Sequence, residues 1–282
     1  TRLELSFNYQ DRPYYRRTLT SMTWTYSWSN EKYSSFAVRP VDLNLVDMSY
    51  INQDFFEKLQ NLYLRNSYTS QLVAGISGSY TYNNQLKNPG RNATLVRFNW
   101  ETAGNLIGGL EHLFSSPAKG KDYYEIFGIQ CSQYFRVDLS ASRKIMLGEK
   151  AAIAGRLYAG CGLAYGNSTS IPFDRLFYCG GSNGMRGWIP RMLGPGSVPV
   201  DPDKVTYPVQ LGDMKLEANL EFRFPIWGIF HGATFFDVGN IWFMGNSAEE
   251  YPPEAVFHIR DFYKQLGFNT GLGIRLDIKF AV

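Results

Sequence analysis

Apolar and polar residues alternate with a period of two through most of this chain, a pattern that is typical of β-strands. In the clearest segment, 215–224, Leu, Ala, Leu, Phe and Phe alternate without a break against Lys, Glu, Asn, Glu and Arg. Nine other segments share the pattern, so the sequence predicts an all-β chain of ten strands. Their approximate ranges are 2–9, 22–28, 37–48, 72–82, 96–101, 127–139, 153–163, 215–224, 231–243 and 271–280.

Alternation alone does not separate a transmembrane antiparallel β-barrel from a soluble sandwich or barrel, because each has one apolar and one polar face. Three further features favour the membrane barrel. The predicted strands are long, aromatic residues gather near the strand ends, and short connections alternate with long ones, as expected for periplasmic turns and outer loops. The short connections are predicted at 29–34, 83–92, 140–150 and 225–228, and the long ones at 51–69, 102–124, 165–212 and 244–267.

The chain has neither an internal repeat nor a low-complexity linker, so residues 1–282 are expected to form one domain. A small helix is predicted at 52–66, within one of the outer loops. The N-terminus does not show a basic start followed by an apolar run. We therefore expect the export signal of an outer-membrane protein to lie outside the given sequence.

Composition agrees with interleaved apolar and polar positions. Aromatic residues make up 16% of the chain and hydrophobic residues 44%, and the mean hydropathy is −0.26. The net charge of +3 arises from basic residues spread along the chain, so no nucleic-acid partner is expected. The three cysteines, Cys131, Cys161 and Cys179, form no CxxC pair, and neither a disulfide framework nor a zinc site is predicted.

Signatures of enzymes are missing from the sequence. It contains no HExxH, GxSxG or Walker motif and no GxGxxG after a strand, and the three histidines, His112, His231 and His258, lie far apart. The segment Asp201-Pro202-Asp203 is interpreted as a solvated turn instead of a calcium site. We therefore predict no enzymatic activity, no metal and no cofactor.

One segment stands apart from the alternating pattern. Residues 180–188, with the sequence GGSNGMRGW, place Arg186 in a glycine-rich loop between two predicted strands. Neither Lys-Ser/Thr nor a capped helix follows these glycines, so a phosphate-binding loop is not expected. A buried arginine needs an acidic partner. The runs 213–224 and 235–242 downstream each contain an acidic candidate.

This loop resembles the sixth outer loop, with its VRGF/Y motif, of the outer-membrane protein assembly superfamily. That superfamily includes BamA-type and TamA-type insertases and two-partner secretion transporters. Met185 and Trp188 are the departures from the motif, and both are conservative. The segments 193–196, 220–225, 235–240 and 271–277 resemble the family in the same region, and 7–13 resembles the TamA-like lipoprotein branch of Bacteroidetes.

The resemblance implies a sixteen-stranded barrel, of which this chain would be strands five to fourteen. N-terminal POTRA domains and the terminal strands would then lie outside the given sequence. It also implies that the loop folds into the barrel lumen, where Arg186 pairs with Glu221 and Asp237. Glu221 falls on the polar face of its predicted strand, in agreement. The other implied motif residues are Gly180, Gly181, Gly187 and Trp188.

Two alternatives concern the charged residues themselves. Arg186 would lie in a solvated loop, with Asp237 capping a turn, if the resemblance did not hold. Other charges on the predicted polar faces are interpreted as a generic lining of the lumen. They are Arg97, Glu101, Arg136, Asp138, Arg156, Lys215, Glu217, Arg275 and Asp277.

The leading hypothesis is the barrel of a bacterial outer-membrane protein that helps to fold and insert other outer-membrane proteins. Its expected partners are unfolded outer-membrane protein clients, outer-membrane lipids, and periplasmic or lipoprotein accessory subunits. Three alternatives remain open at this point: a secretion transporter of the same superfamily, the barrel of a fusion that carries a secreted hydrolase, and a diffusion porin.

Overall fold

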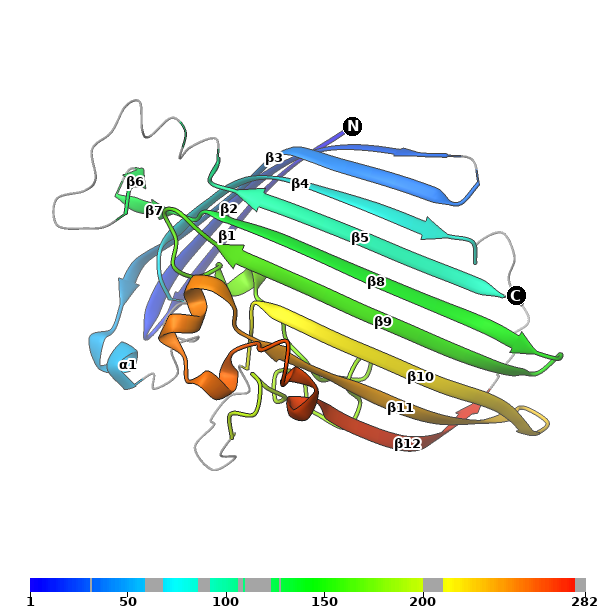
Figure 1. Cartoon of the computed structure of the whole chain (residues 1–282). Helices are drawn as coiled ribbons and strands as arrows, with labels where there is room; N and C mark the ends of the chain where they lie inside the picture. The colour runs from blue at the N-terminus through cyan, green and yellow to red at the C-terminus, as the bar shows by residue number, and fades with distance from the viewer. Residues whose placement is uncertain are drawn as a thin grey trace.

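The computed structural model describes residues 1–30, 32–58, 68–85, 92–105, 109, 123–126, 128–199 and 210–276. Within these residues the chain forms one β-sheet, and its ten long strands follow one another in chain order with antiparallel pairing. Figure 1 shows that the sheet curves from the first strand round to the last. The first and last strands do not pair with each other in the described sheet. The sheet therefore has the form of a partial barrel.

The ten long strands confirm the predicted all-β antiparallel fold. Two short strands, β6 (Glu125–Ile126) and β7 (Ile129–Cys131), lie off the main path, and β7 pairs in parallel with β4. The long strands are β1 (Arg2–Arg12), β2 (Tyr15–Ser29), β3 (Ser34–Ile51), β4 (Gln71–Asn83), β5 (Ala93–Ala103), β8 (Tyr134–Leu147), β9 (Ala151–Ala164), β10 (Met214–Trp227), β11 (Phe230–Trp242) and β12 (Gly267–Leu276).

Apart from the turn between β1 and β2, short and long connections lie at opposite ends of the sheet (Figure 1). One end has the tight turns after β2, β8 and β10. The other end has the helix α1 (Gln53–Lys58), β6 and β7, and the 3-10 turns η1 (Phe173–Arg175), η2 (Gly245–Glu250), η3 (Pro253–Ala255) and η4 (Phe262–Gln265). The turn between β1 and β2 is also short, with Pro13 and Tyr14 alone, but it lies at this second end. There the Tyr14 carbonyl accepts a hydrogen bond from the N–H of Asn52, next to α1.

The sixth predicted strand, 127–139, is broken in the structure. β7 ends at Cys131 and β8 begins at Tyr134, because the two residues between them bond elsewhere. The Ser132 N–H donates to the Leu72 carbonyl at 2.8 Å, and the Gln133 N–H donates to a serine hydroxyl in the β9–β10 connection at 2.8 Å.

The turn predicted at 140–150 was too long. β8 continues to Leu147, and only Gly148 to Lys150 connect it to β9, with Gly148 at a φ of +77° that favours glycine. The predicted helix at 52–66 is α1 over 53–58, and residues 59–67 lie outside the described part of the chain. The same holds for His112, Asp277 and the predicted turn 201–203.

The two faces of the sheet differ in polarity and exposure. Large apolar side chains stand exposed on one face, including Leu157 (64%), Leu220 (54%) and Leu272 (85%). The other face holds polar residues that are buried although many carry charge, among them Glu101, Asp138, Glu217, Glu221 and Asp237. An apolar face of this extent is unfavourable in water and typical of strands that contact lipid.

No helix in the described residues is long and apolar enough to cross a membrane.

Replacing Leu220 by arginine tests the assignment of the apolar face. Leu220 lies near the middle of β10, and an arginine on the lipid face at mid-bilayer costs about 2–4 kcal/mol. We expect Leu220→Arg to lower the free energy of unfolding of the intact protein in lipid vesicles by about that amount, measured by urea titration of its heat-modifiable gel mobility.

Thr23→Arg is the matched control. Thr23 lies on the polar face of β2, paired with Glu4 on one side and Asp42 on the other. A new cation there has two acidic neighbours, so we expect a change below about 1 kcal/mol. Equal losses in the two variants would contradict the assignment of the faces.

Candidate functional site

The connection between β9 and β10 lies against the polar face of the sheet. Two isolated β-bridges fix its course, one between Phe177 and Gly212 and one between Cys179 and Leu193. Between the two halves of the second bridge, residues 180–188 form a compact turn. In it the Gly181 N–H donates to the Trp188 carbonyl at 2.9 Å.

The turn is anchored by an apolar side chain as well as by its backbone. Met185 is fully buried and belongs to a cluster with Phe177, Cys179 and Ile241, against which Trp188 packs. Because Met185 points into this cluster, the next residue, Arg186, points toward the wall formed by β10 and β11.

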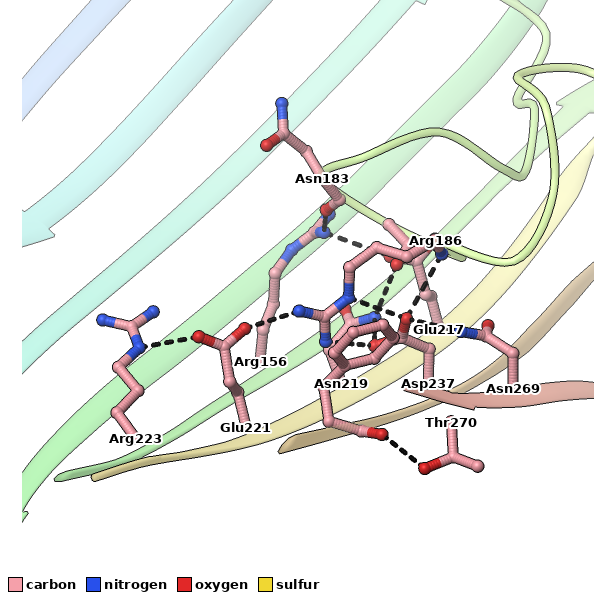
Figure 2. Close-up of polar contacts among 12 residues, drawn as sticks. Arg156, Asn183, Arg186, Glu217, Asn219, Glu221, Arg223, Asp237, Asn269 and Thr270 are labelled. Carbon is pink, nitrogen blue, oxygen red and sulfur yellow. Dashed lines mark hydrogen bonds and ion pairs between the residues drawn. The ribbon is translucent and has the colours of Figure 1, made fainter. Parts of the chain in front are cut away.

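Arg186 and Asp237 form a bidentate ion pair (Figure 2). The Arg186 Nε donates to Asp237 Oδ2 at 2.9 Å, and Nη2 donates to Oδ1 at 2.6 Å. The backbone N–H of Arg186 adds a third bond to Oδ2 at 3.2 Å. Asp237 is 0% exposed. The hydrogen bonds to Asp237 raise the pKa of Arg186 above its ordinary value, so this cation persists at all accessible pH values.

Two amide side chains complete the surroundings of Asp237. Asn219 on β10 donates to Oδ1 at 3.0 Å, and Asn269 on β12 donates to Oδ2 at 3.2 Å. Both are the direct cross-strand partners of Asp237 in the sheet. One carboxylate thus receives hydrogen bonds from the loop, from β10 and from β12, which satisfies it despite its burial.

Glu221 is the second acceptor of Arg186 and is shared by three arginines. Arg186 Nη1 donates to Glu221 Oε2 at 2.5 Å, while Oε1 accepts from Arg223 Nε at 2.7 Å and lies 2.9 Å from Arg275 Nη2. The Arg186 guanidinium also stacks on the ring of Phe235, with Cζ 3.6 Å from the ring centroid. The hydrogen bonds of the Arg186 guanidinium and the contact of its flat face with Phe235 therefore both hold the loop against the strands.

The glycines of the loop permit its close approach to the wall. A Cβ on Gly184 would lie 2.9 Å from both carboxylate oxygens of Glu217, and one on Gly187 would lie 2.8 Å from the Cβ of Asn269. Gly180 and Gly181 have φ values of +103° and +97°, which other residues adopt only with strain.

Glu217 forms a further contact between the wall and the loop. Its carboxylate binds Arg156 Nη1 at 3.0 Å and Lys215 Nζ at 2.9 Å, and it is buried. Arg156 Nη1 also donates to the backbone carbonyl of Asn183 in the loop (Figure 2). The same arginine therefore joins the loop to both β9 and β10.

A second anchor holds the first part of the connection against the opposite strands. Arg175, in η1, lies with its Nε 3.3 Å from Oε1 of Glu101 on β5. The hydroxyl of Tyr134 on β8 donates to the same oxygen at 2.5 Å. Next to it, Asp174 lies 3.5 Å from Nη2 of Arg17 on β2. The connection therefore crosses the polar face from β2 to β12.

The described polar side chains around the loop are joined by ion pairs and hydrogen bonds. They contain no group of three or more His, Cys, Asp and Glu residues placed to hold a metal ion. Burial raises the pKa of the Cys179 thiol to about 12, so it is protonated at neutral pH and a poor nucleophile. The ion pairs of this site hold the loop 180–188 against strands β10 and β11.

The residues named from the family resemblance come together in the structure, and several others join them. Arg186 contacts both Glu221 and Asp237. The interpretation of the remaining charges as a generic lining was too broad, because six of them contact the connection or its partners: Glu101, Arg136, Arg156, Lys215, Glu217 and Arg275. No pattern in the sequence indicated Arg175. One feature could have identified Asn219 and Asn269 as partners of Asp237. Both lie on the polar faces of the two strands that pair with the strand of Asp237.

Comparisons with known proteins identify the family of this chain. The model of the Omp85 superfamily domain matches residues 1–281. The chain is 30% identical over 158 residues to the outer membrane protein assembly factor BamA of Neisseria meningitidis serogroup B. The aligned region covers 54% of this chain and 18% of that protein.

A solved structure shares the fold. The crystal structure of BamA from Haemophilus ducreyi lacking POTRA domains 1–3 matches with a TM-score of 0.61 and 16% identity, over 94% of this chain and 49% of that chain. This chain thus spans about half of that structure and a smaller part of the Neisseria protein. Because the family match extends over nearly every residue, this protein belongs to the Omp85 superfamily of outer-membrane proteins.

Proposed function

We propose that this chain is the membrane-barrel part of a protein that helps to fold and insert other outer-membrane proteins, without enzymatic chemistry. Its clients are unfolded outer-membrane proteins, and it works with periplasmic or lipoprotein accessory subunits. The observation that carries the proposal is the Arg186 loop, held by Asp237 and Glu221 on the polar face of an Omp85 barrel sheet. The similarity to the Neisseria protein, an outer membrane protein assembly factor, supports the same function.

In this proposal Arg186 is a structural lock. A bidentate pair with a buried carboxylate is strong and directional, and stacking on Phe235 fixes the plane of the guanidinium. With the loop held, β10, β11 and β12 keep their relative positions while a client is inserted elsewhere on the barrel. The lock therefore stabilises the working shape of the barrel and takes no part in bond chemistry.

Replacing Arg186 by alanine tests this role. The change leaves Asp237 buried without its cation, and breaking a buried ion pair in this way costs about 3–5 kcal/mol. We expect Arg186→Ala, in the intact protein in cells, to reduce the amount of folded client porin in the outer membrane severalfold, measured by heat-modifiable mobility of the porin in membrane fractions.

Arg97→Ala is the matched control, because Arg97 is an exposed arginine on the polar face of β5, away from the loop. It removes the same charge and is expected to leave client assembly unchanged. Unchanged protein level together with unchanged client insertion in Arg186→Ala would contradict the proposal. Loss of export of a soluble protein with normal porin insertion would instead indicate a secretion transporter.

A charge-rescue experiment tests the pairing itself. In Arg186→Met, Asp237 loses the one cation within ion-pair distance among the described residues, whereas Glu221 keeps Arg223 and Arg275. Removing the stranded charge with Asp237→Asn should then restore about 1–3 kcal/mol of the lost stability. Glu221→Gln in the same background should restore none. The free energy of unfolding in lipid vesicles is the measurement.

The amounts of stability that the two second substitutions restore show which carboxylate is the main partner of Arg186. If Glu221→Gln restores stability as well as Asp237→Asn does, then Asp237 is not the main partner of Arg186. If Asp237→Asn alone, with Arg186 present, costs nothing, the bidentate pair does not contribute to stability.

A further inference from the structure

Arg143 is an exception on the outward face of the sheet. In β8 the odd-numbered residues face outward, and the exposed ones other than residue 143 are apolar: Phe135, Leu139, Ile145 and Leu147. Arg143 falls in this series and is exposed. Within the fully described strands β8 to β11, it is the only charged residue at an outward position.

The register places Arg143 near one rim of the sheet. Its cross-strand partners are Thr94 on β5 and Gly155 on β9. Thr94 is the second residue of β5, which begins at the end of the sheet with the short turns (Figure 1). Because short turns face the periplasm in outer-membrane barrels, Arg143 lies in the periplasmic half of the apolar face, with only Ile145 and Leu147 beyond it on the outward side of β8. A long arginine side chain at this position can extend its guanidinium toward the lipid phosphates of that leaflet.

This cation has no acidic partner among the residues that the structure describes. Among the described residues, none of the acidic groups that form ion pairs does so with Arg143. A guanidinium on a lipid-facing surface is unfavourable when unpaired, more so with increasing depth. Its planar set of donors matches a phosphate group, which accepts two parallel hydrogen bonds from it.

A groove in the apolar face adjoins Arg143. Its volume is about 540 Å³, and Arg143 and Thr94 contribute to its lining. The groove exists because Ala141, Gly155 and Ala218 stand where neighbouring positions carry large side chains. A Cβ on Gly155 would meet no atom nearer than 3.9 Å, so the space above it is open. Leu157, Leu220, Phe236 and Val238 complete its apolar sides.

From these features we infer that the groove is a phospholipid site. The phosphate of a lipid in the periplasmic leaflet binds the Arg143 guanidinium, and an acyl chain of the same lipid lies over Ala141, Gly155 and Ala218. Charge complementarity selects the head group, and the missing side chains make room for the tail. The inference is independent of the proposed assembly function, because it concerns the opposite face of the sheet from the Arg186 loop.

Native mass spectrometry of the intact protein tests the site. The protein is purified in dodecyl maltoside, which has no phosphate, and titrated with dioleoylphosphatidylglycerol. We expect the first lipid to bind about tenfold more weakly to Arg143→Gln than to the wild type, which corresponds to the loss of one charge-assisted contact. Ala218→Phe, which fills the groove and leaves Arg143 in place, should weaken binding by a similar factor, and Ala218→Leu is the milder version.

Lys144→Gln is the matched control, because Lys144 is the next residue and faces the opposite side of β8. It should bind the first lipid as the wild type does, and heat-modifiable mobility verifies that every variant is folded. Wild-type affinity in Arg143→Gln would overturn the head-group contact, and wild-type affinity in both Ala218 variants would overturn the groove. Displacement of the lipid by millimolar inorganic phosphate would also overturn the proposal, since the site would then recognise phosphate without a tail.

Discussion

The pair between Arg186 and Asp237 is the interaction on which the inner half of this structure depends. A carboxylate that is 0% exposed is tolerated only with a cation and enough donors, and Asp237 obtains both from the loop and from its neighbouring strands. The other features of the loop serve this contact. Glycines allow the backbone to come close, and the buried Met185 directs the arginine at the wall.

The fold could be predicted from the sequence because a transmembrane strand shows its two environments in alternate residues. That periodicity located all ten long strands, but it could not locate the break at Ser132 and Gln133, whose backbone bonds to distant segments decide it. The partners of Arg186 were named from a family resemblance, supported by parity at Glu221. Contacts such as Arg175 with Glu101 join residues far apart in sequence, and no local pattern indicates them.

The two faces of the sheet differ in how their charged side chains are paired. On the polar face, charged side chains are buried, and each carboxylate of the loop cluster binds cations of the protein itself. On the apolar face charges are nearly missing from β8 to β11, so the solvent there, lipid, supplies whatever partner a charge requires. The loop and the bilayer thus stabilise opposite faces of the same strands by different means.

The row of Asn219, Asp237 and Asn269 across three adjacent strands has a consequence for folding. Side chains alternate between faces, so a slip of β11 by one residue would turn Asp237 toward lipid and Phe236 toward the lumen. Arg186 would then have lost its bidentate partner, and the loop could not close. Docking of the loop therefore discriminates between strand alignments. The loop stabilises β10, β11 and β12 only when all three strands are paired in the native register.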